Sequence, residues 1–151
     1  MPAFSLAIDK FIAKANAAPA IVVRKVATDL LSSIVYATPV GNTDLWKTKY
    51  PPKGYAGGRA RANWNVSLNR IDATVSVTTF DKNGAPTITR GLASINQWQP
   101  NDTIWIASGL PYITALEYGH STQSLPHAMV RLNVMRFQNF IDAAVRSLPN
   151  K

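Results

Sequence analysis

The chain contains no cysteine among its 151 residues. Disulfides, thiolate metal sites and a cysteine nucleophile are therefore excluded. Long apolar runs are missing too. Asp9, Lys10 and Lys14 interrupt the N-terminal segment, and no stretch approaches the roughly 18 apolar residues that span a bilayer. We therefore expect neither a secretory signal peptide nor a membrane helix, and we expect the chain to be soluble.

Residues that commonly carry catalysis are scarce. Glu117 is the one glutamate, and the aspartates are scattered without a paired motif. His120 and His127 are the only histidines, and with Glu117 they form a Glu-x-x-His-x6-His spacing. A metal site needs three or four ligands on one face, and we favour a helix end followed by a loop, with the histidines exposed or bonded to backbone. The G-x-x-x-x-G-K-[ST] and G-x-S-x-G motifs are absent. We predict no enzymatic activity, no cofactor and no metal.

Acidic residues are outnumbered by basic ones. Sixteen Lys and Arg stand against eight Asp and Glu, which gives a net charge of +8 and a pI near 10.1. This balance favours nucleic acid, an anionic surface or an acidic protein as partner, without selecting among them. With 46% hydrophobic residues the chain can bury a core, so we predict one domain over residues 1–151.

Apolar residues recur at steps of three and four in several segments, which predicts helices over residues 5–16, 19–37, 87–98, 111–118 and 128–148. Thr38-Pro39 ends the second of these, because the residue before a proline avoids helical geometry. Gly119 ends the fourth with a positive φ. The last is a long C-terminal helix whose apolar side is formed by Val130, Val134, Phe137, Ile141, Ala144 and Leu148.

Alternation of apolar and polar residues predicts three strands. Segments 63–69 and 71–78 alternate in this way and are expected to form a hairpin, with a turn around Asn69-Arg70 and one buried face. The third strand spans 103–108, with Ile104 and Ile106 inward. The order of elements predicts an α+β fold: a small, mainly antiparallel sheet packed by the N-terminal helices and the long C-terminal helix.

Residues 40–60 show no periodicity and contain several glycines and prolines. Irregular segments of this length are usually functional or disordered. A purely solvated loop rarely carries much aromatic area, so we interpret the segment as a basic, aromatic arm that packs on its own subunit or on a neighbour. The side chains that define the arm are Trp46, Lys47, Tyr50, Lys53, Tyr55 and Arg59.

The same region supports a second interpretation, a basic nucleic-acid-binding module. Basic residues neutralise phosphates, and aromatic side chains stack on bases. No recognition-helix, zinc-finger or RNA-recognition signature is present, which favours backbone contact within a larger assembly over sequence-specific binding. Trp64 is better explained as a core residue. The interleaved residues are Trp46, Lys47, Lys49, Tyr50, Lys53, Tyr55, Arg59, Arg61, Trp64 and Arg70.

Three segments carry unusual residues where the element pattern places turns. They read TPVGN at 38–42, continuing through DLWK at 44–47 and PKGYAGGRARANW at 52–64, then LPYITALEYGHS at 110–121, and PHAMVR at 126–131. In order and spacing, over roughly residues 22–145, the chain resembles the neck and tail-completion family of tailed bacteriophages, which includes tail terminators and head–tail joining proteins. Many members join the first turn to the Gly-Arg step by a short Asp-Thr-Gly link, where this chain has the long arm.

The resemblance implies a structural virion protein rather than an enzyme. Such proteins form rings of about six or twelve copies at the head–tail junction, join head to tail and let DNA pass. It also implies contacts with the adjoining connector and tail-tube proteins, non-specific contact with DNA in the channel, no membrane contact, and a place in the virion after synthesis in the bacterial cytoplasm.

Contacts to neighbouring subunits or rings are expected from the arm and from the three segments. Glu117 is expected to pair with Arg61 or Arg131, within or between subunits. The alternative is a solvated glutamate at a helix end, worth about 0–1 kcal/mol. The full set of expected contacts is Trp46, Lys47, Tyr50, Lys53, Tyr55, Arg59, Arg61, Glu117, Tyr118 and Arg131.

Overall fold

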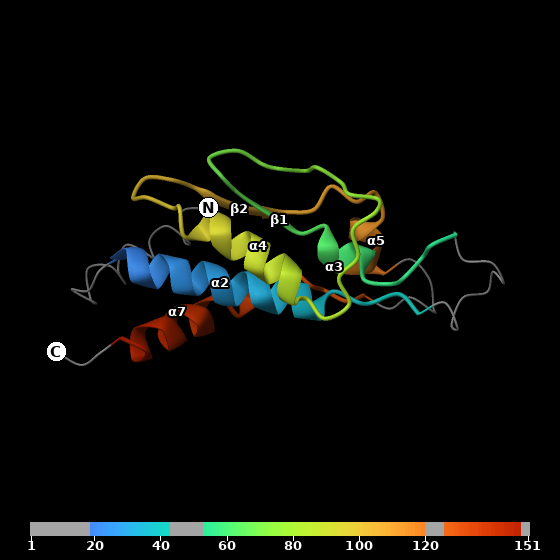
Figure 1. The fold of residues 1–151 in the computed structure, drawn as a ribbon. Helices are drawn as coiled ribbons and strands as arrows, with labels where there is room; N and C mark the ends of the chain where they lie inside the picture. Colours follow the sequence, from blue (N-terminus) through green and yellow to red (C-terminus); the bar gives the residue numbers. More distant parts are fainter. Residues whose placement is uncertain (1–18, 43–52, 120–125, 149–151) are drawn as a thin grey trace.

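The computed structural model describes residues 19–42, 53–119 and 126–148 (Figure 1). The fold is α+β, as the order of the expected elements indicated. The helix expected at 5–16 and the part of the arm with Trp46, Lys47 and Tyr50 lie outside the described residues. The elements are α2 (Pro19–Ala37), α3 (Arg59–Ala62), β1 (Asn65–Leu68), α4 (Ala85–Ile95), β2 (Ile104–Ala107), α5 (Ile113–Tyr118), α6 (Arg131–Met135) and α7 (Phe137–Arg146).

The elements stack in layers, which Figure 1 shows from the sheet to α7. α4 packs on β1 and on α2, and α2 packs on α7. The sheet of β1 and β2 therefore lies on one side of the stack and α7 on the other. Within the described ranges, no helix has both the length and the apolar character needed to cross a bilayer.

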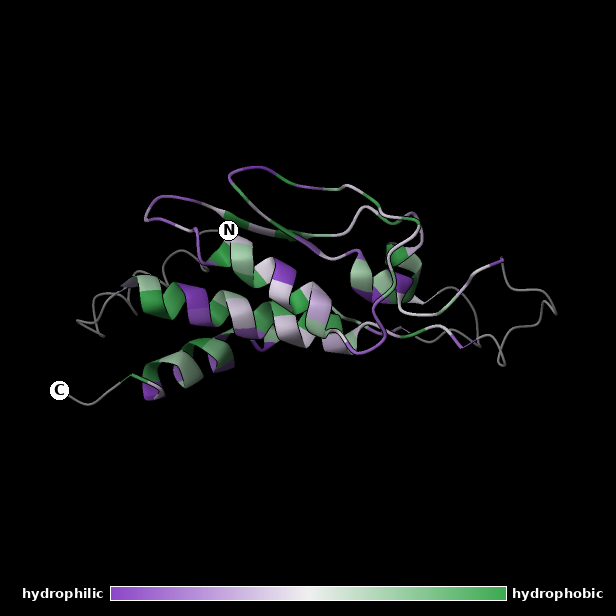
Figure 2. Cartoon of the chain, viewed as in Figure 1, coloured by the Kyte–Doolittle hydropathy of each residue, from purple (hydrophilic) through white to green (hydrophobic). Residues whose placement is uncertain are grey.

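α2 forms over the predicted residues and is buried on two sides. Val22 and Val26 pack with Ile141 and Ala144 of α7. The other side packs toward α4 and the sheet, and Figure 2 shows apolar residues recurring along α2 between polar ones. This second cluster contains Ala27, Leu31, Ile34 and Val35 together with Trp64, Ile95 and Met129. α2 is therefore the central helix that joins the two clusters.

The sheet has two strands in the described part of the chain. β1 runs antiparallel to β2, with Asn65 opposite Ala107 and Leu68 opposite Ile104. Ile104 and Ile106 pack against the core, as predicted, while Trp105 between them is exposed. The predicted hairpin is wrong, because residues 71–78 follow β1 without forming a strand.

Asparagine side chains take the place of the expected hairpin ladder. Asn65 Nδ2 donates to the carbonyls of Asp72 and Thr74, at 3.3 and 2.8 Å. Asn63 donates to the Ser76 carbonyl at 3.0 Å and accepts from the Ser76 N–H at 2.7 Å. Because the neighbouring β1 residue Val66 faces the core, these bonds hold the segment over the outer face of the sheet, away from α4 (Figure 1). The alternation of apolar and polar residues predicts an extended chain, but it does not specify which groups form hydrogen bonds with the backbone of that chain.

The prediction of one continuous helix over residues 128–148 is also wrong. The segment is divided into α6 and α7 at Arg136, which has φ −91° and ψ 6°. Val130 and Val134, predicted inward, are exposed, and Met129 and Asn133 are buried in their place. Met129 packs with Trp64, whereas Ile141 packs with Val22. The turn at Arg136 lets the two parts reach different clusters.

Candidate intersubunit surface

The three segments that carry the resemblance meet at one end of the fold, where α3 and α5 lie (Figure 1). Trp64 Nε1 donates to Thr38 Oγ1 over 2.8 Å, which joins the end of the first segment to its beginning. Trp64 also shares a cluster with Leu116 and Met129, which belong to the second and third segments. We call this region the α3–α5 end.

Arg61 binds three backbone carbonyls of its own subunit. Its Nε donates to Thr38 O at 2.8 Å, its Nη1 to Lys82 O at 2.6 Å and its Nη2 to Tyr36 O at 3.1 Å. The bonds to Tyr36 and Thr38 satisfy carbonyls where α2 ends, which have no partner within the helix, and the bond to Lys82 ties this end to the loop before α4. Arg61 therefore stabilises the subunit itself, and it is not the partner of Glu117.

Asp81 connects the Gly-Arg step to the start of α4. Its backbone N–H donates to Gly58 O at 3.1 Å, and its carboxylate accepts from Gly84 N at 2.7 Å and from Thr87 N at 2.9 Å. Burial tends to raise the pKa of Asp81, but the hydrogen bonds from Thr87 and Gly84 outweigh it and hold the pKa below its ordinary value. An aspartate shortly before Pro86 at the start of a predicted helix is the signal that could have identified this anchor.

Glu117 is buried at the end of α5 and holds the start of α6. Its carboxylate accepts from the backbone N–H groups of Val130 at 2.9 Å and Arg131 at 3.0 Å. Arg131 Nε lies 3.2 Å from Oε1, and Arg131 Nη2 donates to the Glu117 carbonyl at 3.0 Å. The predicted pair therefore forms with Arg131 within one chain, and the solvated alternative is wrong.

The protonation of Glu117 follows from opposing effects. Burial tends to raise its pKa, because the ionised carboxylate loses hydration. Hydrogen bonds from Val130 and Arg131, with the positive charge of Arg131, prevail and hold the pKa of Glu117 below its ordinary value. The carboxylate is therefore ionised at neutral pH, which suits the three donors that it accepts from.

Tyr118 presents an aromatic ring beside this ion pair, in which only Glu117 is buried. The residue is 57% exposed, and the guanidinium carbon of Arg131 lies 4.3 Å from its ring centroid. This is a cation–π contact. Gly119 then leaves the helix with φ 77°, which confirms the predicted positive φ, although its ψ of 157° makes the exit extended. Glu117 is thus committed to its own subunit, while Tyr118 faces solvent.

The described part of the arm packs partly on its own subunit. The ring of Tyr55 meets Phe80 edge to face, with centroids 6.3 Å apart and planes at 80°. Burial raises the pKa of Tyr112, and the positive charge of Arg59 opposes this rise in part. The arm was expected to pack either on its own subunit or on a neighbour, and Tyr55 packs on its own subunit. Lys53 is exposed.

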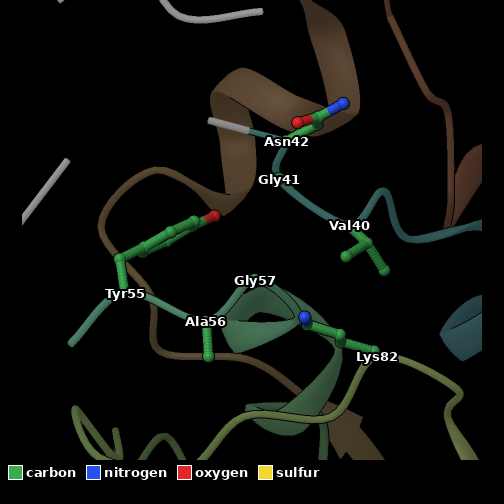
Figure 3. Close-up of a pocket in the computed structure, with 7 residues that line it drawn as sticks. All are labelled: Val40, Gly41, Asn42, Tyr55, Ala56, Gly57 and Lys82. Carbon is green, nitrogen blue, oxygen red and sulfur yellow. The ribbon is translucent and has the colours of Figure 1, made fainter. Parts of the chain in front are cut away.

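A hollow of about 370 Å³ lies where the arm leaves the α3–α5 end (Figure 3). In Figure 3 the Tyr55 hydroxyl points toward Gly41, and the Lys82 ammonium group points toward Gly57. A Cβ at Gly41 would collide with that hydroxyl. The residues that line the hollow offer an amine from Lys82 and a phenol from Tyr55, but no carboxylate or imidazole. Its lining is Val40, Gly41, Asn42, Tyr55, Ala56, Gly57 and Lys82.

Other arginines also bind the backbone of their own subunit. Arg24 donates to Trp98 O at 2.8 Å, and Arg90 donates to Ala62 O at 2.7 Å and to Trp64 O at 3.0 Å. Part of the positive charge is therefore used to satisfy internal carbonyls. Within the ranges 19–42, 53–119 and 126–148, no three His, Cys, Asp or Glu side chains are grouped so that they could hold a metal ion.

Comparison of the chain with protein-family models, with characterised proteins and with solved structures finds no match. The candidate surface is therefore defined by its own geometry. Of the expected contact residues, the structure places Arg61, Glu117 and Arg131 in bonds within the subunit. It leaves Tyr118 and Lys53 exposed and Tyr55 and Arg59 half-buried.

Proposed function

We propose that the chain is a structural virion protein of a tailed bacteriophage that forms a ring at the head–tail junction. The convergence of the three resemblance segments at the α3–α5 end carries this proposal. The segments lie far apart in the sequence, yet Thr38, Trp64, Leu116 and Met129 form one connected unit. A motif whose separate parts support one local structure is more specific than any part alone.

The chemistry of this end suits assembly better than catalysis. Three of its charged groups, Arg61, Asp81 and Glu117, are occupied by bonds within the subunit. Beside the exposed Lys82, the surface there carries aromatic and apolar residues, a composition typical of protein interfaces. They include Tyr112, 40% exposed, and Tyr118, followed along the chain by the exposed Val130, Leu132, Val134 and Met135 of α6 and its start.

The proposed partners are further copies of the chain, in a ring of about six or twelve, together with the adjoining connector and tail-tube proteins. Non-specific contact with DNA in the channel is part of the proposal. Exposed cations could serve either DNA phosphates or an acidic neighbour. In the described residues they include Lys53, Arg70, Lys82, Arg136 and Arg146.

The alternative expected from the sequence, a basic nucleic-acid-binding module, is less well supported by this geometry. Two of the residues on which it rests are engaged within the subunit: Arg61 donates to its backbone carbonyls, and Trp64 is buried in the core. Arg90, which belongs to the same region of the fold, is likewise bonded to backbone carbonyls.

Deletion of the gene from the phage that encodes the chain tests the proposed function. We expect DNA-filled heads and finished tails that fail to join, as seen by electron microscopy of lysates. Expression of the wild-type chain from a plasmid restores joined particles. An unchanged yield of joined, infectious particles without the chain contradicts the proposal, and recovery of the chain on nucleic acid outside particles supports the alternative.

A further inference from the structure

The outer edge of β2 is an open row of backbone donors and acceptors. The N–H of Asn69 donates to Thr103 O at 2.8 Å, so these two opposite residues form a hydrogen-bonded pair. Along an antiparallel ladder, hydrogen-bonded pairs alternate with pairs whose backbone N–H and C=O groups point away from the partner strand. Ile104 and Ile106 therefore turn their backbone groups away from β1, and no described residue bonds to them there.

The edge of β2 is poorly protected against another strand. Native proteins commonly place charges, prolines or bulges on such edges. β2 reads Ile-Trp-Ile-Ala, and Trp105 is 39% exposed. β2 is short, which limits the strength of an added ladder, but it carries neither a charge nor a proline. The far edge of β1 differs, because Arg90 donates to the carbonyls of Ala62 and Trp64 beside it.

The chain also contains a strand-like segment without a ladder. Residues 71–77 alternate between apolar and polar, and the side chains of Asn63 and Asn65 hold them through the carbonyls of residues 72, 74 and 76. In the part of the chain that the structure describes, the backbone groups of Val75 and Val77 have no hydrogen-bond partner. Val77 is 62% exposed, and Ile71 is also exposed.

We propose that residues 71–77 of one copy add as a strand to the β2 edge of the next copy. This inference rests on the proposed ring. The two elements are different parts of the surface, so the contact is head-to-tail and repeats from copy to copy until the ring closes. Strand addition draws affinity from main-chain hydrogen bonds and specificity from alternate side chains. It also extends a two-stranded sheet, which is marginal by itself, to three strands.

The absence of cysteine makes site-specific cross-linking a direct test. Val77→Cys and Trp105→Cys chains are prepared separately, mixed during assembly and treated with a short thiol-reactive cross-linker. We expect a covalent dimer that joins the two variants, in ring-sized species and not in the dilute monomer. The matched control pairs Trp105→Cys with Thr89→Cys, which lies on an exposed position of α4 and should give only background.

A proline pair tests the backbone bonds themselves. Ile106→Pro removes an N–H that faces away from β1, and Val66→Pro removes the equivalent N–H at the opposite edge. We expect assembly to weaken roughly ten-fold or more for Ile106→Pro, because main-chain bonds to the neighbour are lost, and to be retained for Val66→Pro. Circular dichroism checks that both remain folded. If Ile106→Pro unfolds, the cross-link decides.

The outcomes separate this inference from the proposed function. Wild-type rings without a Val77–Trp105 cross-link above the control overturn the strand addition and leave the ring in place. A cross-link between two Trp105→Cys chains alone shows a symmetric β2 pairing and overturns it as well. Failure of the wild-type chain to form closed oligomers, both in solution and in purified particles, removes the proposed function and the strand addition with it.

Discussion

Arg131 contacts Glu117 three times. Its backbone N–H and its Nε reach Oε1 at 3.0 and 3.2 Å, and its Nη2 reaches the Glu117 carbonyl at 3.0 Å. The pair fixes the last turn of α5 to the first turn of α6, and α6 leads directly to α7, which packs on α2. The same arginine lies over Tyr118, so one residue links the buried carboxylate to the exposed aromatic surface.

Replacing Glu117 by Gln should destabilise the subunit by about 1.5–3 kcal/mol, because buried donors lose a charged acceptor. The free energy of unfolding from urea denaturation measures the effect. Asp142→Asn is the matched control, since that carboxylate accepts from Gln138 on the exposed side of α7 and should change stability by less than about 0.5 kcal/mol. Equal stability of Glu117→Gln and wild type would show that the pair contributes little.

Stability should fall with acid. The pKa values of Glu117 and Asp81 in the folded chain lie below their ordinary values, so both groups favour folding once the unfolded carboxyls, with pKa values of about 4, are ionised. This contribution is present above about pH 4.5 and is lost as the pH falls through the folded pKa values. Thermal unfolding from pH 7 to pH 3 should show the gap between wild type and Glu117→Gln narrowing. A constant gap contradicts the assignment.

Gly58 and Gly54 provide a second matched pair. Both have positive φ, 84° and 81°, but a Cβ at Gly58 collides with the backbone of Asp81, whereas one at Gly54 meets open space. Gly54→Ala should cost about 1–2 kcal/mol of left-handed strain. Gly58→Ala should cost more, because the Asp81 loop must also move. Unfolding measurements compare the two, and similar losses would mean that the contact with Asp81 is easily relaxed.

Tyr118 should affect assembly rather than folding. Its cation–π contact with Arg131 is exposed, so Tyr118→Ala should change the free energy of unfolding by less than about 1 kcal/mol. The fraction of joined particles in a complemented deletion should fall, and Tyr118→Phe, which keeps the ring, should restore it. If Tyr118→Ala gave the same fraction of joined particles as the wild type, Tyr118 would not belong to the proposed interface.

Local signals predicted the elements that begin and end on proline or glycine. Helix α2 lies between Pro19 and Thr38-Pro39, and α5 ends at Gly119. The division of the C-terminal helix has no such signal. The buried Met129, Asn133 and Ile141 and the partly buried Phe137 continue at steps of four across the turn at Arg136. Only the positions of the two clusters on which α6 and α7 pack decide where the helix must turn.

The candidate surface was predictable in kind but not in detail. Charge alone indicated an arginine partner for Glu117, but distinguishing Arg131 from Arg61 required the fold. Arg61 was expected at an interface because its charge is visible in the sequence, whereas the α2 carbonyls that bind it are not. The hairpin failed for the same reason, because nothing in the alternation of residues 71–78 indicates that Asn63 and Asn65 bind their backbone.

Cryo-electron microscopy of the head–tail junction, in particles of the tailed phage that we propose as the source of the chain, tests the central claim most directly. The account predicts density for the chain in a closed ring between the connector and the tail tube, with residues 71–77 of one copy beside β2 of the next. Particles that are complete at this junction without the chain would contradict it.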